Sequence, residues 1–165
     1  ATALKNEVKV VDRPKAISGD LEPTITTLQH VLETIDDEID NVILLQPTNP
    51  LRPKSLLEEA MKTVVEGAYD SLMTVTRNSQ KFGKIKNEQF VPFNYEIGQR
   101  SQDLEPLYFE NGLLYITRAT VIKSGKIIGD NNCPYIVNHP YAKVDIDDFE
   151  DVKYAEFILK NYPNE

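Results

Sequence analysis

Apolar residues recur along this chain at spacings that predict where helices and strands lie. Between Ile25 and Ile35 they return every three or four positions, directly after Pro23, which suits the first turn of a helix. The run 42–45 is apolar throughout and is soon followed by a proline, a pattern typical of a short strand buried on both faces. We therefore expect a helix and then a buried strand in this region.

The middle of the chain continues the alternation of strand and helix. Apolar positions between Leu56 and Val64 fall on one helical face, and Gly67 follows in the usual cap position. Residues 71–76 then have the pattern of a further strand. A strand, a helix and a strand in this order predict a βαβ unit, with parallel strands and a right-handed crossover.

After Arg77 the pattern weakens. Residues 78–110 are polar, with short apolar segments at 84–86 and 90–93 that a turn at Asn87-Glu88 would join into a hairpin. Such a segment has too few apolar residues to form a hydrophobic core of its own. We expect it to be either a long functional excursion or a dimerisation arm.

Regular structure is expected again from Asn111 onward. Residues 111–117 and 135–137 read as strands, and 144–147 reads as the end of a strand. A last helix follows, capped by an aspartate at 147 or 148. On its helical spacing, these side chains are expected to face inward: Phe149, Val152, Ala155 and Leu159.

Together these elements predict an α/β fold. Residues 1–77 and 111–165 would form one domain with a mixed sheet and flanking helices, and residues 78–110 would protrude from it. The chain has 165 residues, enough for one domain with a sizeable core.

The charge of the chain excludes some classes of function. The net charge is −8 and the pI about 4.8, which argues against nucleic acid as a partner, because a phosphate backbone needs a basic surface. No apolar run approaches membrane-spanning length. Cys133 is the only cysteine, so an internal disulfide is excluded and a reduced, cytoplasmic setting fits.

The loop after the first predicted strand gathers polar side chains in a rigid frame. Prolines at 47, 50 and 53 restrict its backbone, and Gln46, Thr48, Asn49 and Arg52 lie between or beside them. In open α/β sheets, ligands bind at the carboxyl ends of strands. The alternative is an ordinary proline-rich connection.

A second candidate lies near the carboxyl end, at Asp145-Ile146-Asp147. In an extended strand, residues two apart point the same way, so both carboxylates would share one face and repel each other unless a cation neutralises them. Mg²⁺ is suitable, because it binds one or two carboxylates together with substrate phosphates. The alternative is that both are solvated or cap the following helix.

The amino-acid sequences of these segments resemble the motifs of one protein family. Gln-Pro-Thr-Asn-Pro-Leu-Arg, starting at Gln46, closely resembles the Gln-Pro-Thr-Ser-Pro-Leu-Arg signature of the CMP-sialic acid synthetases (acylneuraminate cytidylyltransferases), with Asn49 in place of the serine. Asn-Gly-Leu-Leu-Tyr, from Asn111 to Tyr115, is similar to the family's Asn-Gly-Ala-Ile-Tyr. The Asp-x-Asp pair, followed by Asp151 and by Ala-Glu in the last helix, also matches.

The resemblance implies roles for individual residues. Asp145 and Asp147 would hold Mg²⁺ on the nucleotide, and Gln46 would contact the acyl sugar, since an amide both donates and accepts hydrogen bonds. Asn111 and Tyr115 would lie at the substrate.

Arg100 lies in Gln-Arg-Ser-Gln-Asp-Leu, which resembles the family's Arg-Arg-Gln-Asp-Leu. In the family, that stretch supplies an arginine, from the partner subunit, to the sugar carboxylate; here Arg100 matches the first arginine and Ser101 replaces the second. Near the start, Arg13 and Thr24 fall where the family has an Arg-Pro pair and a ligand-facing hydroxyl.

The resemblance implies a three-layer, Rossmann-like nucleotidyltransferase fold and a homodimer. The activity would join CTP to a nonulosonic acid such as N-acylneuraminate, releasing pyrophosphate. Alternatives are a CMP transferase for legionaminate or 3-deoxy-manno-octulosonate, or an inactive truncated dimerisation module. The family's opening strand and phosphate-binding loop have no counterpart in the sequence, so we expect a fragment with little or no activity of its own.

Overall fold

The computed structural model describes residues 2–162 of the chain. The helices are α1 (Thr2–Lys5), α2 (Thr24–Thr34), α3 (Leu56–Glu66), α4 (Ala119–Lys123) and α5 (Phe149–Asn161). The strands are β1 (Asn41–Leu44), β2 (Ser71–Asn78), β3 (Gly83–Lys86), β4 (Gln89–Pro92), β5 (Leu107–Arg118) and β6 (Asn132–Ile136). Short 3₁₀ helices are η1 (Lys15–Ile17), η2 (Ser101–Asp103) and η3 (Pro140–Lys143).

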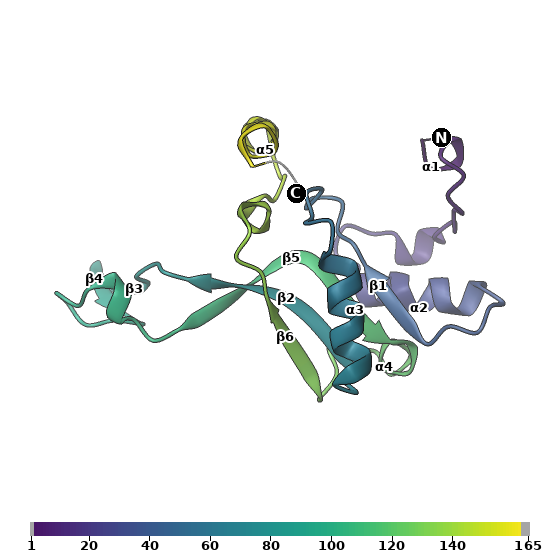
Figure 1. The fold of residues 1–165 in the computed structure, drawn as a ribbon, viewed down its shortest axis with the longest axis horizontal. Helices are drawn as coiled ribbons and strands as arrows, with labels where there is room; N and C mark the ends of the chain where they lie inside the picture. Colours follow the sequence, from purple (N-terminus) through teal and green to yellow (C-terminus); the bar gives the residue numbers. More distant parts are fainter. Residues whose placement is uncertain (1, 163–165) are drawn as a thin grey trace. The chain divides into compact units, whose positions relative to one another are not determined.

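The main sheet has the strand order β1-β5-β2-β6 (Figure 1). Strand β1 is antiparallel to β5, with Leu44 opposite Tyr115. The chain is therefore mixed α/β, as its sequence predicts, and consistent with a Rossmann-like nucleotidyltransferase fold. One detail of the predicted βαβ unit is wrong: β1 and β2 are not direct neighbours, because β5 lies between them. The position of β5 between these two strands could not be predicted from the local sequence, since β5 comes much later in the chain.

The chain divides into two compact units. The first comprises residues 1–44, 58–72 and 115–133, and the second comprises residues 45–57, 73–114 and 134–165. Strands β2 and β5 and helix α3 contribute residues to both units. No helix of residues 2–162 is long and apolar enough to cross a membrane.

In the first unit, buried aliphatic side chains come from helices and strands alike. Ala60 and Val64, one helical turn apart on α3, are buried, as the helical spacing predicts. Leu72, Ile116 and Ile122 are fully buried. Because these side chains belong to β2, β5 and α4, the core of the unit joins the sheet to its helices.

The edge position of β1 changes its expected burial. Its residues are half-buried or exposed, and Ile43 is 39% exposed, so the prediction of a strand buried on both faces is wrong. The strand order explains this, since β1 is the outer strand of the sheet and has a neighbour on one side only.

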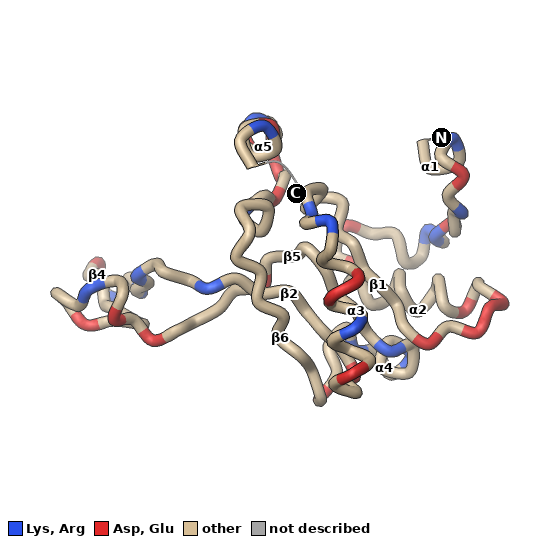
Figure 2. Tube along the Cα trace, viewed as in Figure 1, with Lys and Arg blue, Asp and Glu red and all other residues tan. Residues whose placement is uncertain are grey.

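Acidic residues follow α2 in a group. Figure 2 shows them between α2 and β1, where Asp36, Asp37 and Glu38 are exposed. Lys9 lies 3.9 Å from Asp37, a fully solvated pairing that contributes little to stability. This group behaves as a solvated boundary of the helix.

In the second unit, a small core forms between η3 and α5. Its buried members are Tyr141, Val144, Ala155 and Ile158, against which Leu51 and Ile146 pack. Asp148 caps α5, as one of the predicted alternatives has it: its carboxylate accepts from the backbone N–H groups of Glu150 and Asp151. This core therefore seats the end of the 46–52 loop against the last helix.

The predicted inner face of α5 is partly wrong. Ala155 is buried as expected, but Phe149 is 72% exposed and Leu159 53% exposed, while Ile158 is buried instead. Apolar residues lie on several sides of this helix, so their spacing does not single out one face.

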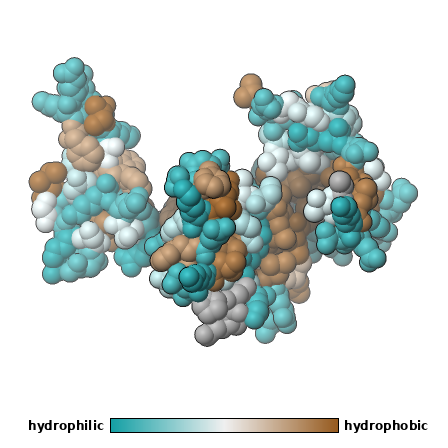
Figure 3. All heavy atoms as spheres, turned by 90° about the horizontal axis from the view of Figure 1, so that it is seen from above, coloured by the Kyte–Doolittle hydropathy of each residue, from teal (hydrophilic) through white to brown (hydrophobic). Residues whose placement is uncertain are grey.

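Residues 78–110 contain the predicted hairpin, formed by β3 and β4. Asn87 and Glu88 both have positive φ, 50° and 63°, which is the backbone of a two-residue hairpin turn of type I′. The hairpin and its flanks expose large apolar side chains, among them Ile85 (73%) and Ile97 (78%). Figure 3 shows apolar atoms interspersed with polar ones at its left end, where this segment lies.

Candidate functional site

Arg52 anchors both ends of the 46–52 loop. Its Nη2 donates to the carbonyl oxygen of Gln46 (2.9 Å), and its Nε donates to the carbonyl oxygen of Leu113 in β5 (2.7 Å). Burial lowers the pKa of the Arg52 guanidinium, which still remains protonated at neutral pH. The loop is therefore fixed to the strand by a charged donor as well as by its prolines.

Asn49 lies at the centre of the same loop. It is 2% exposed, and its Nδ2 donates to two carbonyl oxygens, those of Asn111 (3.2 Å) and Val144 (2.9 Å). The backbone adds a further bond, from the N–H of Ile146 to the carbonyl of Thr48 (2.8 Å). The loop is thus hydrogen-bonded to β5 on one side and to the 144–146 segment on the other.

Gly112 makes room for the side chain of Gln46. Its φ is +72°, and a Cβ at this position would lie 2.6 Å from Oε1 of Gln46 and closer still to Oδ1 of Asn49. Such approaches do not occur between real atoms, so only glycine lets these two amides lie against the strand. Gly112 is therefore a point of close backbone approach between the strand and the loop.

Asn111 turns its side chain into the sheet. Its Oδ1 accepts from Thr74 Oγ1 (2.6 Å), and its Nδ2 donates to Thr76 Oγ1 (2.9 Å). All three residues are buried. Asn111 therefore fixes the start of the Gly112 turn, and its predicted contact with substrate stays a prediction.

Sequence reasoning missed the two threonines. Thr74 and Thr76 are alternate residues of β2 and therefore lie on the same face of the strand. That spacing was a usable signal, because buried hydroxyls need partners and two on one strand face suggest a polar network.

Asp145 and Asp147 are both exposed and flank the half-buried Ile146. The prediction that they lie on a strand end is wrong, because residues 144–147 are outside the strands and follow η3. The exposure pattern nevertheless alternates, as in extended chain. Asp151 is occupied elsewhere, because its Oδ2 accepts from the backbone N–H groups of residues 147 and 148.

The donor chemistry of this pair fits Mg²⁺. Two exposed carboxylate groups, one on each side of a side chain that packs into the core, are hard oxygen ligands of the type this ion prefers. Within residues 2–162, no group of three or more histidine, cysteine, aspartate or glutamate side chains is arranged to hold a metal. Protein ligands beyond the pair are not required, since Mg²⁺ usually keeps water and phosphate ligands.

Arg100 is exposed and engaged in a local ion pair. Its Nε and Nη2 donate to the two carboxylate oxygens of Asp103, at 2.8 and 3.0 Å. The paired guanidinium stands just before η2. Its predicted role toward a sugar carboxylate would require it to exchange one carboxylate for another.

The remaining predicted residues belong to the first unit. Arg13 donates to Ser18 Oγ (3.2 Å) and to Thr27 Oγ1 (2.7 Å), which ties the segment before η1 to helix α2. Thr24 is the first residue of α2 and is exposed. Tyr115 is half-buried in β5. The second unit thus holds Gln46, Asn111, Arg100 and the aspartate pair, and the first unit holds Arg13, Thr24 and Tyr115.

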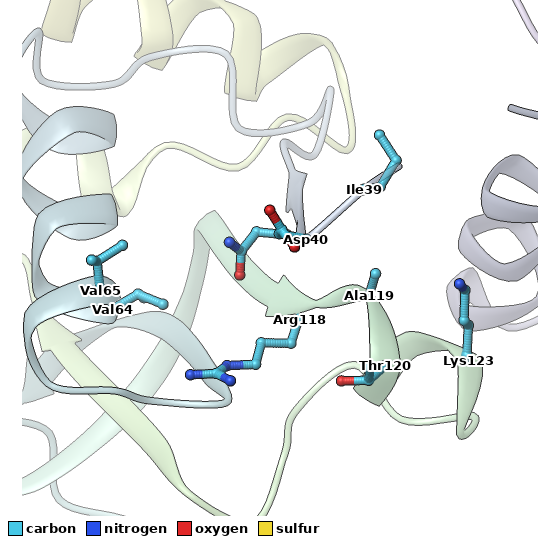
Figure 4. A pocket seen from close by; sticks show the side chains of 9 residues that line it. Ile39, Asp40, Val64, Val65, Arg118, Ala119, Thr120 and Lys123 are labelled. Atoms are coloured by element: carbon cyan, nitrogen blue, oxygen red, sulfur yellow. The ribbon is translucent and has the colours of Figure 1, made fainter. Parts of the chain in front are cut away.

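The first unit also contains a cavity that no motif predicted. It has a volume of about 400 Å³. Figure 4 shows Val64 and Val65 of α3 on one side and Lys123 of α4 on the other, with Arg118 between them. Arg118 lies 4.0 Å from Asp70 and donates to the carbonyl of Tyr69. These partners hold its guanidinium against the unit's own chain.

Similarity to known proteins points in one direction. The chain is 29% identical to N-acylneuraminate cytidylyltransferase of Streptococcus agalactiae serotype V, over 69% of this chain and 29% of that protein. It is 29% identical to N-acylneuraminate cytidylyltransferase A of Danio rerio, over 88% of this chain and 35% of that protein. It is 24% identical to pseudaminic acid cytidylyltransferase of Campylobacter jejuni serotype O:23/36, over 90% of this chain and 67% of that protein.

The similarity covers most of this chain but only part of its relatives. No family model matches the chain. The chain spans about a third of the length of the first two relatives, and most of its own length is covered by the similarity. The shared names and the motifs built around Gln46, Gly112 and Asp145 agree with one another. On these similarities, the chain resembles the N-acylneuraminate and pseudaminic acid cytidylyltransferases.

Proposed function

We propose that this chain forms part of a cytidylyltransferase that activates a nonulosonic acid, N-acylneuraminate, with CTP. The products would be the CMP-sugar and pyrophosphate. The observation that carries the proposal is the similarity to N-acylneuraminate cytidylyltransferases over 88% of the chain, which takes in most of its predicted site residues. The hydrogen bonds that Arg52 makes to the carbonyls of Gln46 and Leu113 support it, because a preorganised loop loses little entropy on binding a sugar.

In the proposed reaction, the anomeric hydroxyl of the sugar attacks the α-phosphorus of CTP. A new P–O bond forms, the bond to the bridging oxygen breaks, and pyrophosphate leaves. Gln46 would orient the sugar through its hydroxyl groups, and Arg100 would pair with the sugar carboxylate. Orientation of this kind supplies much of the acceleration in such displacements.

Asp145 and Asp147 would hold Mg²⁺ against the nucleotide phosphates. When bound, the ion offsets negative charge on the phosphates. The exposure of both carboxylates leaves them accessible to a large anionic ligand.

The proposed roles of Arg13, Thr24 and Tyr115 are in substrate binding, and that of Asn111 is in fixing the Gly112 turn. We further propose that the protein is a homodimer joined through the 78–110 segment. The exposed apolar side chains of its hairpin support this, since such side chains usually mark an interface when they form a patch.

Pseudaminic acid is the second candidate substrate. This chain covers 67% of the length of a pseudaminic acid cytidylyltransferase of Campylobacter jejuni. Both candidates are nonulosonic acids, so the two alternatives share the chemistry and differ in the groups around the sugar ring.

The test is to incubate the purified protein with CTP, Mg²⁺ and each acid sugar. N-acetylneuraminate, pseudaminate, legionaminate and 3-deoxy-manno-octulosonate would be compared, with CMP-sugar measured by anion-exchange chromatography. Ligand-observed NMR would measure sugar binding in the same samples, independently of turnover. We expect N-acetylneuraminate to bind, and to be the preferred substrate wherever turnover occurs.

Gln46→Leu provides the residue-level check. Removing the amide should weaken acid-sugar binding about tenfold or more and leave CTP binding unchanged, because a binding group built for a hydroxyl is lost. Gln29→Leu is the matched control, since this glutamine lies on α2 and bonds to the carbonyl of Lys123. Failure of all four sugars both to bind and to react would exclude the proposal.

A further inference from the structure

Two parts of the candidate site that are far apart in sequence are joined through one buried side chain. Gln46 belongs to the 46–52 loop, and the carboxylates of Asp145 and Asp147 lie about a hundred positions later. Asn49 reaches both neighbourhoods, because one amide nitrogen donates to the carbonyls of Asn111 and Val144. Val144 directly precedes Asp145.

The position of the acidic segment depends on this loop at two points. The amide of Asn49 holds the carbonyl of Val144 at 2.9 Å, and the carbonyl of Thr48 holds the N–H of Ile146 at 2.8 Å. These bonds flank Asp145 on both sides. Ile146 also packs against the core formed by η3 and α5, so the backbone between the two carboxylates is fixed from both directions.

Asn49 also lies close to Gln46, because its backbone N–H donates to the carbonyl oxygen of Gln46 at 3.2 Å. Oδ1 of Asn49 and Oε1 of Gln46 both lie against the bare Cα of Gly112. The Nδ2 group of Asn49 bonds to the carbonyl of Asn111, one residue before that glycine. The side chains of Asn49 and Gln46 therefore both lie against the same glycine of the strand.

We propose that Asn49 is a positioning residue that locks the Gln46 loop to the segment bearing Asp145 and Asp147. The sugar-contacting amide and the cation-binding carboxylates then form one rigid unit instead of two independent segments. The assignment of ligands to these groups rests on the proposed function, and the mechanical coupling does not.

Asparagine is suited to this position by its hydrogen-bonding groups. Its amide offers two N–H donors and the buried site presents two carbonyl acceptors, so both are satisfied. A serine, the residue of the family signature here, carries one donor on a shorter side chain. A buried carbonyl left without a partner is costly, so the segment that loses its bond should open.

The first measurement is hydrogen exchange of the Ile146 amide in Asn49→Ser. We expect exchange to accelerate about tenfold, because the single hydroxyl of serine cannot bond to the carbonyls of both Asn111 and Val144, so the segment is no longer tied to the strand and opens locally. Asn78→Ser is the matched control: this asparagine also lies in the second unit at 9% exposure, but its amide bonds locally to Gln80. Equal exchange at Ile146 in both variants would overturn the proposal.

Mn²⁺ binding gives a second reading that general loss of stability would not produce. Mn²⁺ would be titrated as a paramagnetic probe of the residues around Asp145. We expect its dissociation constant to rise several-fold in Asn49→Ser and to stay unchanged in Asn78→Ser, compared at conditions of equal folded fraction. An unchanged constant in Asn49→Ser would contradict the coupling.

The exchange and Mn²⁺ measurements distinguish a failure of the coupling by Asn49 from a failure of the proposed function. If the unaltered protein binds no Mn²⁺, the proposed role of the aspartates fails, and the exchange measurement alone decides the coupling. Asn49→Asp extends the series, because it places acceptors against two carbonyls and should accelerate exchange beyond Asn49→Ser wherever it folds. Exchange slower than in Asn49→Ser would count against the proposal.

Discussion

Gly112 meets two requirements that no other residue type satisfies together. Its backbone has φ of +72°, and its missing Cβ leaves the space that the amides of Gln46 and Asn49 occupy. The first requirement is conformational and the second is steric. Measuring the two requirements separately would show how much of the stability at this position comes from close contact with the loop.

Gly112→Ala should lower the free energy of unfolding by about 3 kcal/mol, the sum of backbone strain and displacement of the loop. The measurement is urea denaturation, with acid-sugar binding measured on the folded fraction. Gly98→Ala is the matched control, since Gly98 also has positive φ (92°) but nothing lies within 4 Å of its Cβ position. It should cost only about 1 kcal/mol, for strain alone. Equal costs would show that the contact with Gln46 carries no energy.

Some features of the site follow from short segments of sequence, and others do not. The glycine at 112 and the polar, proline-framed loop at Gln46 are visible as motifs, because a few adjacent residues determine them. The bonds of Asn49 to Asn111 and Val144 join positions 62 and 95 residues apart. No local pattern encodes such pairings, which depend on where β5 and η3 come to lie. For the same reason, the position of β5 between β1 and β2 could not be predicted from the sequence.

Among the elements, the β3–β4 hairpin shows how far local chemistry predicts structure. The turn at Asn87-Glu88 was predictable from two short apolar segments with polar residues between them. Its backbone is more demanding than its sequence suggests, because Glu88 adopts φ of 63° and glutamate does so at a cost. The preferred residue at this position of the turn is glycine.

Glu88→Gly should therefore raise the stability of the hairpin by about 0.5–1 kcal/mol, because the left-handed conformation is free of strain in glycine. Hydrogen exchange of the β3 and β4 amides would report the change. Gln89→Gly, one position later in β4, should destabilise instead, since glycine weakens a strand. A loss of stability in Glu88→Gly would show that the glutamate side chain makes a compensating contact.

For the whole molecule, the 78–110 segment is the part that the proposed dimer would use. Ile85 and Ile97 are each more than 70% exposed, so a hydrophobic driving force remains available at this surface. The β3–β4 hairpin has little core of its own, and association of two subunits would bury its exposed apolar side chains.

Sedimentation velocity should give a mass of twice 18.8 kDa for the protein, and about 18.8 kDa for Ile85→Glu combined with Ile97→Glu. Charges placed in an apolar interface are desolvated without partners, which disfavours association. Val65→Glu is the control, because this valine of α3 is also well exposed (66%) but lies in the first unit. A monomeric unaltered protein, or equal dissociation by the control, would contradict the proposed interface.

The buried amide of Asn111 has a consequence for chemical ageing. An asparagine followed by glycine is prone to deamidate, because the unhindered glycine nitrogen attacks the side-chain carbonyl carbon and closes a five-membered imide. Here Thr74 and Thr76 hold both ends of that amide, and the N–H of Leu113 adds a third bond. The carboxamide cannot turn toward Gly112 without breaking this network. The native fold therefore slows the reaction at a sequence that invites it, and time spent unfolded sets how long the Asn111-Gly112 turn stays intact.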